Sequence, residues 1–179
     1  LNNAIVRLFR QENRKNISLD STIIIDNKFT LKGQVDQPDM HFITIEGLPG
    51  NVPVILENAE IKIEVYADSI FSSDFTGGKE TKYFMEYQNF VKSLRVRNDK
   101  ISNDFADANK IQDTAKIALL RQQYEVLLKE NDAYELEYMS KNVDATLSAL
   151  ILERNLPSKK YELNKIKEIY TNFSDDIKK

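Results

Sequence analysis

Residues 20–35, with the sequence DSTIIIDNKFTLKGQV, decide the fold that we expect for the first half of the chain. Within it, residues 28–35 alternate apolar side chains and Gly with Lys, Thr and Gln, which is the period of a strand that buries one face. Residues 20–25 are rich in Thr and Ile and suit a second strand. Asp26 and Asn27 lie between the two and tolerate positive φ. We therefore predict a β-hairpin with a two-residue turn.

Further short runs before Gly77 have the same character, because apolar residues alternate with polar ones or cluster between turn signals. These runs are residues 4–10, 40–45, 52–56 and 60–66. Pro53 indicates that its run is an edge strand or a strand start. Strands at roughly 8- to 12-residue intervals, each with one apolar face, predict an antiparallel β-sandwich.

The sequence pattern changes at Gly77-Gly78. All five glycines lie at or before Gly78, and the uninterrupted remainder favours helices. We predict an antiparallel β domain over residues 1–78 and a helical segment over residues 79–179, packed on or beside it. The expected fold class is α+β.

Several stretches after Gly78 carry apolar side chains three and four residues apart, the spacing of amphipathic helices. They are residues 80–105, 117–128, 145–152 and 163–173. The first two are long and polar on their outer faces, and the polar stretch 107–113 joins them. We expect these two to form a long antiparallel helix hairpin.

The composition of the 179 residues excludes several kinds of site. The chain has no Cys, so it holds no thiolate nucleophile, disulfide or cysteine zinc site. The net charge is −3, whereas phosphate binding needs a concentrated basic face, so we expect no nucleic-acid partner. No apolar run approaches the roughly 20 residues of a membrane span. The chain starts at Leu1, and we expect any secretion signal or lipid anchor upstream of it.

His41 is the one histidine of the chain and the first candidate for chemistry. A histidine can act as a general base or a metal ligand. This one lies in the predicted strand MHFITI, and neither a Cys nor a second His can join it. We interpret His41 as a packing residue of the sheet.

Carboxylates are plentiful, and paired carboxylates support glycosidase or metal chemistry. The candidates are Asp20, Asp26, Glu57, Glu60, Asp104, Asp107, Asp113, Glu125, Glu135 and Glu137. Most of them lie in predicted turns or on polar helix faces and are offset by Lys and Arg, as on solvated surfaces. We predict no catalytic, cofactor-binding or metal residue among them, and no enzymatic activity of the chain itself.

Two other motifs have structural and functional interpretations. The stretch Thr76–Lys79 contains two glycines and a Lys, but it lacks the spacing and the following Ser or Thr of a phosphate-binding loop, and we interpret it as a flexible hinge. Tyr83, Phe84, Tyr87 and Phe90 form an aromatic stripe at helical spacing. A stripe of this kind can stack on a ligand, but we predict that it packs against the sheet or the second helix.

The segment Leu19–Gly33 (LDSTIIIDNKFTLKG) resembles a known family signature, LDS…DGkF.fkG. The family is the domain of unknown function at the N-terminus of many TlpA-like and AhpC/TSA-like thiol-disulfide oxidoreductases of Gram-negative bacteria. Residues 54–65 and 141–145 are similar to later segments of the same family. The chain departs from it at Asn27, where the family often has Gly, and at Val143, where it has Pro.

The resemblance implies a non-catalytic accessory domain of a cell-envelope thiol-disulfide oxidoreductase, periplasmic or lipid-anchored. Such a domain would position or dimerise a thioredoxin-like domain, or recruit its substrate. The implied partner is a C-terminal thioredoxin-like domain of the same protein or another envelope protein, and a homo-oligomer fits the same role. The family's Trp-Cys-x-x-Cys site normally follows the region that here ends at Lys179, so the resemblance places the redox chemistry outside this chain.

Two alternatives stay open. One is a stand-alone binding or interaction protein of the cell envelope, using sandwich edges or the helix hairpin as its surface. The other is a hydrolase that combines carboxylates with His41.

Overall fold

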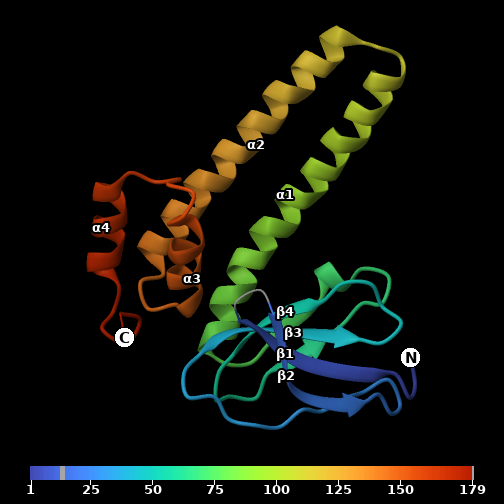
Figure 1. The fold of residues 1–179 in the computed structure, drawn as a ribbon, viewed down its shortest axis with the longest axis vertical. Coiled ribbons are helices and arrows are strands. Elements are labelled where there is room, and N and C mark those ends of the chain that lie inside the picture. Colours follow the sequence, from blue (N-terminus) through green and yellow to red (C-terminus); the bar gives the residue numbers. More distant parts are fainter. Residues whose placement is uncertain (13–14, 179) are drawn as a thin grey trace. The chain divides into compact units, whose positions relative to one another are not determined.

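A computed structural model describes residues 1–12 and 15–178 of the chain. The chain divides into two compact units, Leu1–Met85 and Glu86–Lys179. Figure 1 labels the strands of the larger sheet in the first unit and the α-helices. Each unit is described below by itself.

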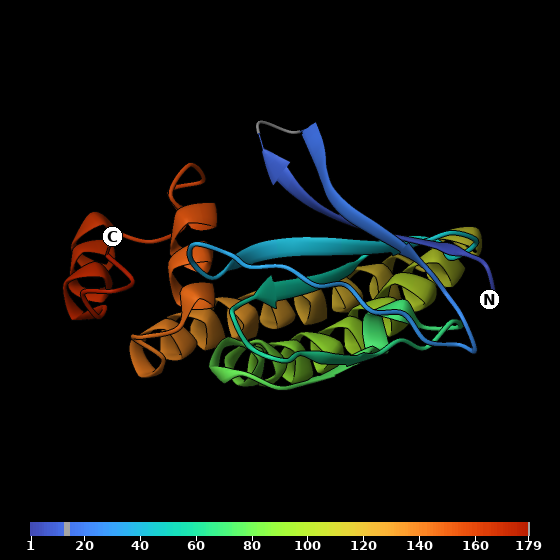
Figure 2. The ribbon, with the colours of Figure 1, turned by 90° about the horizontal axis from the view of Figure 1, so that it is seen from below.

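The first unit contains a four-stranded antiparallel sheet. Its strands are β1 (Ile5–Glu12), β2 (Lys15–Ile23), β3 (Asp39–Ile45) and β4 (Val52–Leu56), in the order β2-β1-β3-β4. Figure 2 shows β1 and β2, the dark blue strands, running side by side. The sheet confirms the antiparallel pairing that we predicted and the strands expected at residues 4–10, 40–45 and 52–56.

One face of this sheet is apolar and buried. Strand β3 places His41, Ile43 and Ile45 on that face, and all three are buried. Residues that pair across a ladder lie on the same face of a sheet. The partners of these three are Val6, Leu8, Val52 and Val54, all buried except the half-buried Leu8. On the opposite face Phe9 stacks on Phe42, with ring centroids 5.5 Å apart.

The hairpin predicted at residues 20–35 is half right. Asp26 and Asn27 form the expected turn with φ of 51° and 59°, and Ile25 and Lys28 exchange two backbone hydrogen bonds of 2.9 Å. The strand predicted over residues 28–35 is wrong, because no ladder continues beyond Lys28. Strand β2 instead starts at Lys15 and pairs along its length with β1.

A separate two-stranded antiparallel pair follows the sheet in the first unit. It consists of β5 (Lys62–Glu64) and β6 (Asp74–Thr76), and the short 3-10 helix η1 (Ile70–Ser72) lies between them in sequence. Strand β5 falls within the run predicted at residues 60–66, whereas β6 was not predicted. Two antiparallel sheets are thus present in the first unit, and the sandwich remains a prediction.

Most of the described residues after β6 form α-helices. They are α1 (Lys79–Lys110), α2 (Thr114–Lys141), α3 (Thr146–Asn155) and α4 (Leu163–Asn172), and each overlaps a predicted helical stretch. Helix α1 begins in the first unit and continues in the second. The mixed α and β content agrees with the predicted class. None of the helices in the described part of the chain is long and apolar enough to cross a membrane.

Helices α1 and α2 contact each other through side chains within the second unit. The three-residue link 111–113 ends at Asp113, which caps α2 by accepting a 2.9 Å hydrogen bond from the Lys116 backbone N–H. Glu86 pairs with Lys141 (2.7 Å) and Arg97 with Glu130. As residue numbers rise along α1 they fall along α2, so the contacting stretches run antiparallel. Helices α3 and α4 also contact α2.

Candidate functional site

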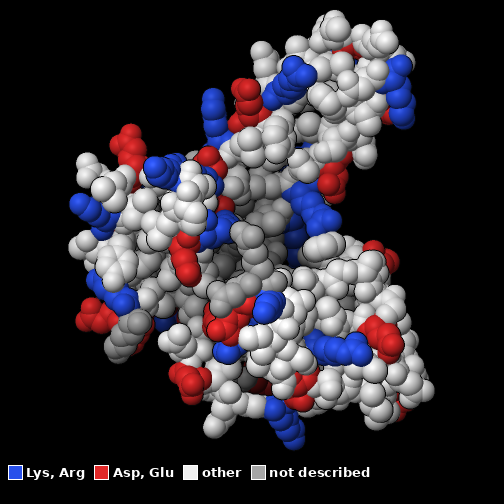
Figure 3. Space-filling model, viewed as in Figure 1, with Lys and Arg blue, Asp and Glu red and all other residues white. Residues whose placement is uncertain are grey.

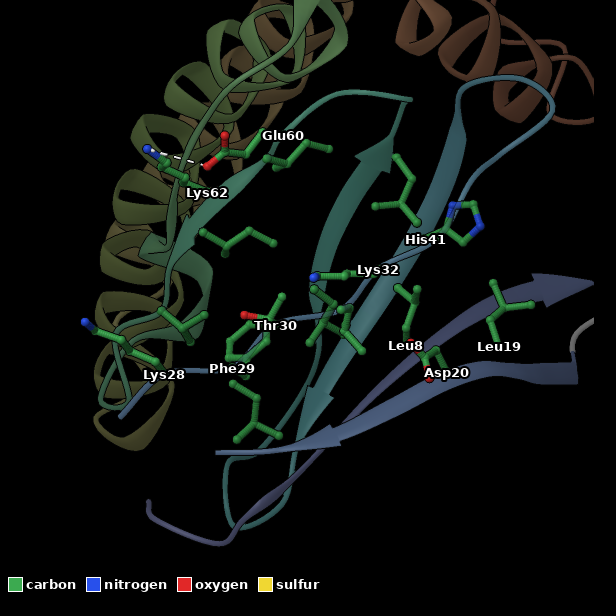
Figure 4. Close-up of a pocket in the computed structure, with 18 of the residues that line it drawn as sticks. Leu8, Leu19, Asp20, Lys28, Phe29, Thr30, Lys32, His41, Glu60 and Lys62 are labelled. Atoms are coloured by element: carbon green, nitrogen blue, oxygen red, sulfur yellow. Dashed lines mark ion pairs between the residues drawn. The ribbon is translucent and has the colours of Figure 1, made fainter. Parts of the chain in front are cut away.

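The first unit contains a cavity of about 1590 Å³ next to the apolar face of the sheet. Leu8, His41 and Ile43 line it from the strands. Two segments outside the four-stranded sheet, residues 27–35 and 57–65, supply most of the remaining lining. Figure 4 shows side chains from these elements around the cavity.

The first of the two covering segments alternates in exposure. Phe29, Leu31 and Val35 are half-buried, whereas Lys28, Thr30, Lys32 and Gln34 are exposed. The inward apolar stripe that the sequence predicted is therefore present. Asn58 holds the far end of this segment in place through two hydrogen bonds. The Val35 backbone N–H donates to Asn58 Oδ1 (3.0 Å), and Asn58 Nδ2 donates to the Val35 backbone oxygen (2.7 Å).

The second covering segment has the same alternation. Ile61, Ile63 and Val65 are half-buried, and Lys62 and Glu64 are exposed. Glu60 and Lys62 form an ion pair of 3.7 Å, drawn as a dashed line in Figure 4. The cavity is thus lined by apolar side chains together with charged and polar ones, which include Asp20, Lys28, Lys32, Glu57, Glu60, Lys62 and Glu64.

His41 is buried at 5% exposure, and its Nδ1 lies 2.9 Å from the backbone oxygen of Asp39. A ring nitrogen facing a carbonyl oxygen carries the proton, so Nδ1 donates this bond. The bond fixes the ring against its own strand. This geometry agrees with the packing role that we predicted.

The stretch Thr76–Lys79, which partly matches a phosphate-binding loop, is a packed turn at the capped start of α1. Both carboxylate oxygens of Glu57 accept backbone hydrogen bonds at the start of the helix, from Lys79 (3.1 Å) and Thr81 (3.1 Å). A Cβ added at Gly77 would lie 2.2 Å from the Glu60 backbone oxygen, and one at Gly78 would lie 2.2 Å from the Glu57 carboxylate. The glycines are required by close contact, which corrects our interpretation of this stretch as a flexible hinge.

In the second unit, Glu135 is buried at 2% exposure, and both of its carboxylate oxygens accept several hydrogen bonds. Its Oε1 accepts hydrogen bonds from Tyr87 (3.2 Å), Asn131 (3.2 Å) and Arg154 (2.6 Å), and its Oε2 from Asn155 (3.0 Å), Lys160 (2.8 Å) and Tyr161 (2.9 Å). These donors come from α1, α2, α3 and the link after α3. A buried carboxylate satisfied in this way joins the elements that supply its partners.

The donors around Glu135 also set its charge state. Burial raises the pKa of this carboxyl, but the hydrogen bonds from Lys160 and Tyr161 and the charge of Arg154 outweigh burial and hold the pKa below its ordinary value of 4.5. Burial and the bond to the carboxylate raise the pKa of Tyr161 to about 12. Neither group is therefore tuned to exchange protons near neutral pH, and the cluster fits a structural role.

Our prediction that Glu135 lies on a solvated helix face is wrong. The apolar side chains of α2 are spread around the helix, so the pattern marks no single buried face. The sequence signal that could have revealed Glu135 is the apolar Met139 one helical turn after it, on the same face of α2. Other carboxylates behave as predicted: Asp107, for example, pairs with Lys110 at the exposed end of α1 (2.8 Å).

The aromatic stripe packs in two places. Phe84 is buried and meets Phe75 edge to face, at 5.4 Å, within the first unit. In the second unit Phe90 stacks on Tyr134 at 3.6 Å, and Tyr87 is buried beside Glu135. These aromatic rings contact other side chains of the chain, as expected for packing residues.

Among residues 1–12 and 15–178, no group of three His, Asp or Glu side chains could hold a metal ion. On the face shown in Figure 3, Lys and Arg are interspersed with Asp and Glu. The cavity of the first unit is therefore the candidate site that geometry favours.

Comparison with known proteins adds a family similarity in the first unit. Neither the curated proteins nor the solved structures contain a significant match to the chain. Residues 1–84 match a family model described as a domain of unknown function (DUF4369). The matched residues include the four-stranded sheet, the lining of the cavity and the capped start of α1. Over this part, the chain is similar to that family.

Proposed function

We propose that the chain is a non-catalytic accessory module of a cell-envelope thiol-disulfide oxidoreductase. It would position or dimerise a thioredoxin-like domain, or recruit the substrate of that domain. The observation that carries this proposal is the resemblance of Leu19–Gly33 to the family signature, which falls within the residues matched by the domain of unknown function. The turn at Asp26-Asn27 supports it, since both residues adopt the positive φ that suits the Gly of the signature.

The architecture suits a scaffold. We propose that the four-stranded sheet and the β5–β6 pair are the two layers of an antiparallel sandwich around the cavity, and that α1 and α2 form a helix hairpin. Such a scaffold presents rigid surfaces but no nucleophile, and the Cys pair would belong to its partner. The periplasm, or a lipid-anchored position in the envelope, follows from the same resemblance.

The test is a binding and activity measurement with a thioredoxin-like partner. A domain with a Trp-Cys-x-x-Cys site, encoded in the same gene or beside it, is titrated with the purified chain by calorimetry. We expect saturable binding and a change in the rate at which the domain reduces protein disulfides. The proposal fails if the flanking coding sequence holds no such domain, or if binding and rates are unchanged.

The cavity favours a second candidate, a stand-alone binding protein of the envelope. A large apolar cavity with a few polar groups is the feature most often associated with ligand binding. A ligand that occupies it raises the melting temperature with concentration. Thermal stabilisation by a ligand in the absence of any thioredoxin-like partner would favour this candidate over the first.

A further inference from the structure

One lining segment of the cavity is built like a strand but pairs with no strand. Residues 28–32 alternate exposed and half-buried side chains, and Val35 is half-buried again. Within the part of the chain that the structure describes, their backbone N–H and C=O groups make no hydrogen bond to another backbone segment. An extended segment with unpaired backbone groups is a template for strand addition.

The inward side of this segment also has a gap. Phe29, Leu31 and Val35 are half-buried and line the cavity, and Gly33, in the same register, also lines it but has no side chain. A Cβ built at Gly33 would meet no heavy atom within 4 Å. The gap opens onto the cavity and leaves room for a side chain from elsewhere.

We propose that an extended polypeptide segment of a partner protein adds as a strand along Phe29–Gln34. Its backbone would pair with the free backbone groups of this segment. Its alternate side chains would enter the cavity over Leu8 and Ile43, with one of them next to Gly33. This is strand addition combined with side-chain pockets, in which the backbone gives affinity and the pockets give specificity.

The size of the cavity favours a polypeptide over a small molecule. Cavities that bind drug-sized ligands measure roughly 300–1,000 Å³, and this one measures about 1590 Å³. An apolar small molecule would also leave the backbone groups of residues 29–34 without partners. A peptide strand fills the cavity and pairs these groups together.

The charge of the segment specifies the partner further. Lys28 and Lys32 are exposed, and residues 28–35 contain no acidic residue. The carboxylates that line the cavity, Asp20, Glu57, Glu60 and Glu64, all come from other segments. No ion pair of either lysine is present in the described chain. Oppositely charged residues across a strand pair stabilise it, and like charges destabilise it. The partner segment should therefore alternate apolar residues with Asp or Glu.

This inference deepens the recruiting role of the proposed function and rests on it only for the identity of the partner. Strand addition needs the first unit alone and no thioredoxin-like domain. A peptide experiment therefore tests the site, and the partner titration above tests the accessory role. Either can fail while the other succeeds.

The experiment uses the full chain and a labelled synthetic peptide of about ten residues that alternates Glu with Val and Phe. Binding is followed by fluorescence anisotropy, and hydrogen exchange locates the contact. We expect saturable binding and slower amide exchange within residues 29–34. A peptide with the same sequence but N-methylated at alternate residues should bind about tenfold more weakly or worse, because it lacks backbone donors.

Two pairs of variants separate the parts of the proposal. Gly33→Phe fills the gap and should weaken peptide binding by about tenfold or more, whereas Gly33→Ala should leave it within about threefold. Lys28→Glu/Lys32→Glu should weaken the Glu peptide about tenfold and favour a Lys peptide of the same pattern. Lys100→Glu/Lys129→Glu makes the same charge change in the second unit and should have no effect. Circular dichroism and melting curves confirm that each variant is folded.

Several outcomes would overturn the proposal. Equal binding of the N-methylated peptide would indicate an apolar pocket without strand pairing. Unchanged exchange within residues 29–34 would place the peptide elsewhere. If the folded wild-type protein does not bind the peptide, the proposed site is excluded. If the chain self-associates and the Gly33→Phe variant abolishes this, the occupant is a second copy of the chain and not a foreign peptide.

Discussion

At the scale of single residues, Glu135 shows how a charged side chain can become part of a core. It is 2% exposed, and a Tyr, an Asn and an Arg bond one of its oxygens while an Asn, a Lys and a Tyr bond the other. Bonds from charged donors are stronger than neutral ones and offset the cost of burial. The result is a buried polar cluster, centred on Glu135, that connects helices in the second unit.

Replacement of this carboxylate tests that role. Glu135→Gln keeps the volume but removes the negative charge opposite Arg154 and Lys160. We expect the free energy of unfolding to fall by about 3–5 kcal/mol, because one partner of a buried ionic cluster is lost. Chemical denaturation measures the change. The control is Glu137→Gln, an exposed residue of the same helix, which should stay within about 0.5 kcal/mol of wild type.

The same residue predicts how stability depends on pH. The pKa of Glu135 is lower in the folded state than its ordinary value of 4.5, so folding favours the ionised form. The stabilisation is complete above the unfolded pKa and is lost as the pH falls through the folded pKa. Denaturation midpoints of wild type and Glu135→Gln should therefore differ at neutral pH and converge as the pH falls below about 4. A difference that grows in acid would contradict this.

At the scale of elements, the start of α1 depends on a side chain distant in sequence. Glu57 satisfies the backbone N–H groups of Lys79 and Thr81, and its negative charge lies at the positive end of the helix dipole. The tight turn at Gly77 and Gly78 allows the approach. The β-rich part of the first unit thereby fixes the first turn of a long helix.

Removal of the cap gives a prediction at this scale. Glu57→Ala should lower the free energy of unfolding by about 1–2 kcal/mol, since two helix N–H groups lose their acceptor. Glu57→Gln keeps one oxygen acceptor and should cost less. Amide exchange near residues 79–82 should accelerate in the Ala variant. A Gln variant as unstable as the Ala variant would show that the charge, and not the hydrogen bonds, dominates.

The two phenylalanines of the aromatic stripe should differ in their contribution. Phe84 is 2% exposed, so Phe84→Ala should destabilise by about 3–5 kcal/mol through loss of buried area and a cavity. Phe90 is half-buried and stacked on Tyr134, so Phe90→Ala should cost only about 1–2 kcal/mol. Melting temperatures of the two variants decide the order, and an unchanged value for Phe84→Ala would mean that it is a surface residue.

Much of the architecture could be predicted from local patterns. The turn at Asp26-Asn27, three strands of the sheet and all four helices follow from periodicity and turn chemistry. The strand over residues 28–35 could not be excluded in this way, because alternation predicts which side chains face inward and not which backbone is paired. Long-range contacts are likewise invisible to periodicity, and both Glu57 and Glu135 owe their roles to partners far along the chain.

At the scale of the whole molecule, the two carboxylates that connect separate elements belong to different units. Glu57 acts within Leu1–Met85 and Glu135 within Glu86–Lys179, and they share no hydrogen-bond partner. Substitutions without shared partners usually act independently.

The double variant tests this independence. Glu57→Ala/Glu135→Gln should lose the sum of the two single losses in free energy of unfolding, to within about 0.5 kcal/mol. The measurement is a double-mutant cycle by chemical denaturation. A coupling energy above about 1 kcal/mol would show that Glu57 and Glu135 are energetically coupled.

The crowding of donors around Glu135 has a consequence for sequence change. A carboxylate offers about four lone-pair positions, fewer than its six donors in the described chain. Donors therefore share positions, and loss of one, as in Tyr161→Phe, leaves the oxygens still satisfied. The hydrogen-bond donors around Glu135 are thus redundant, whereas its carboxylate is the single acceptor group that they share. We therefore expect the fold to tolerate the substitution of a single donor better than the substitution of the carboxylate.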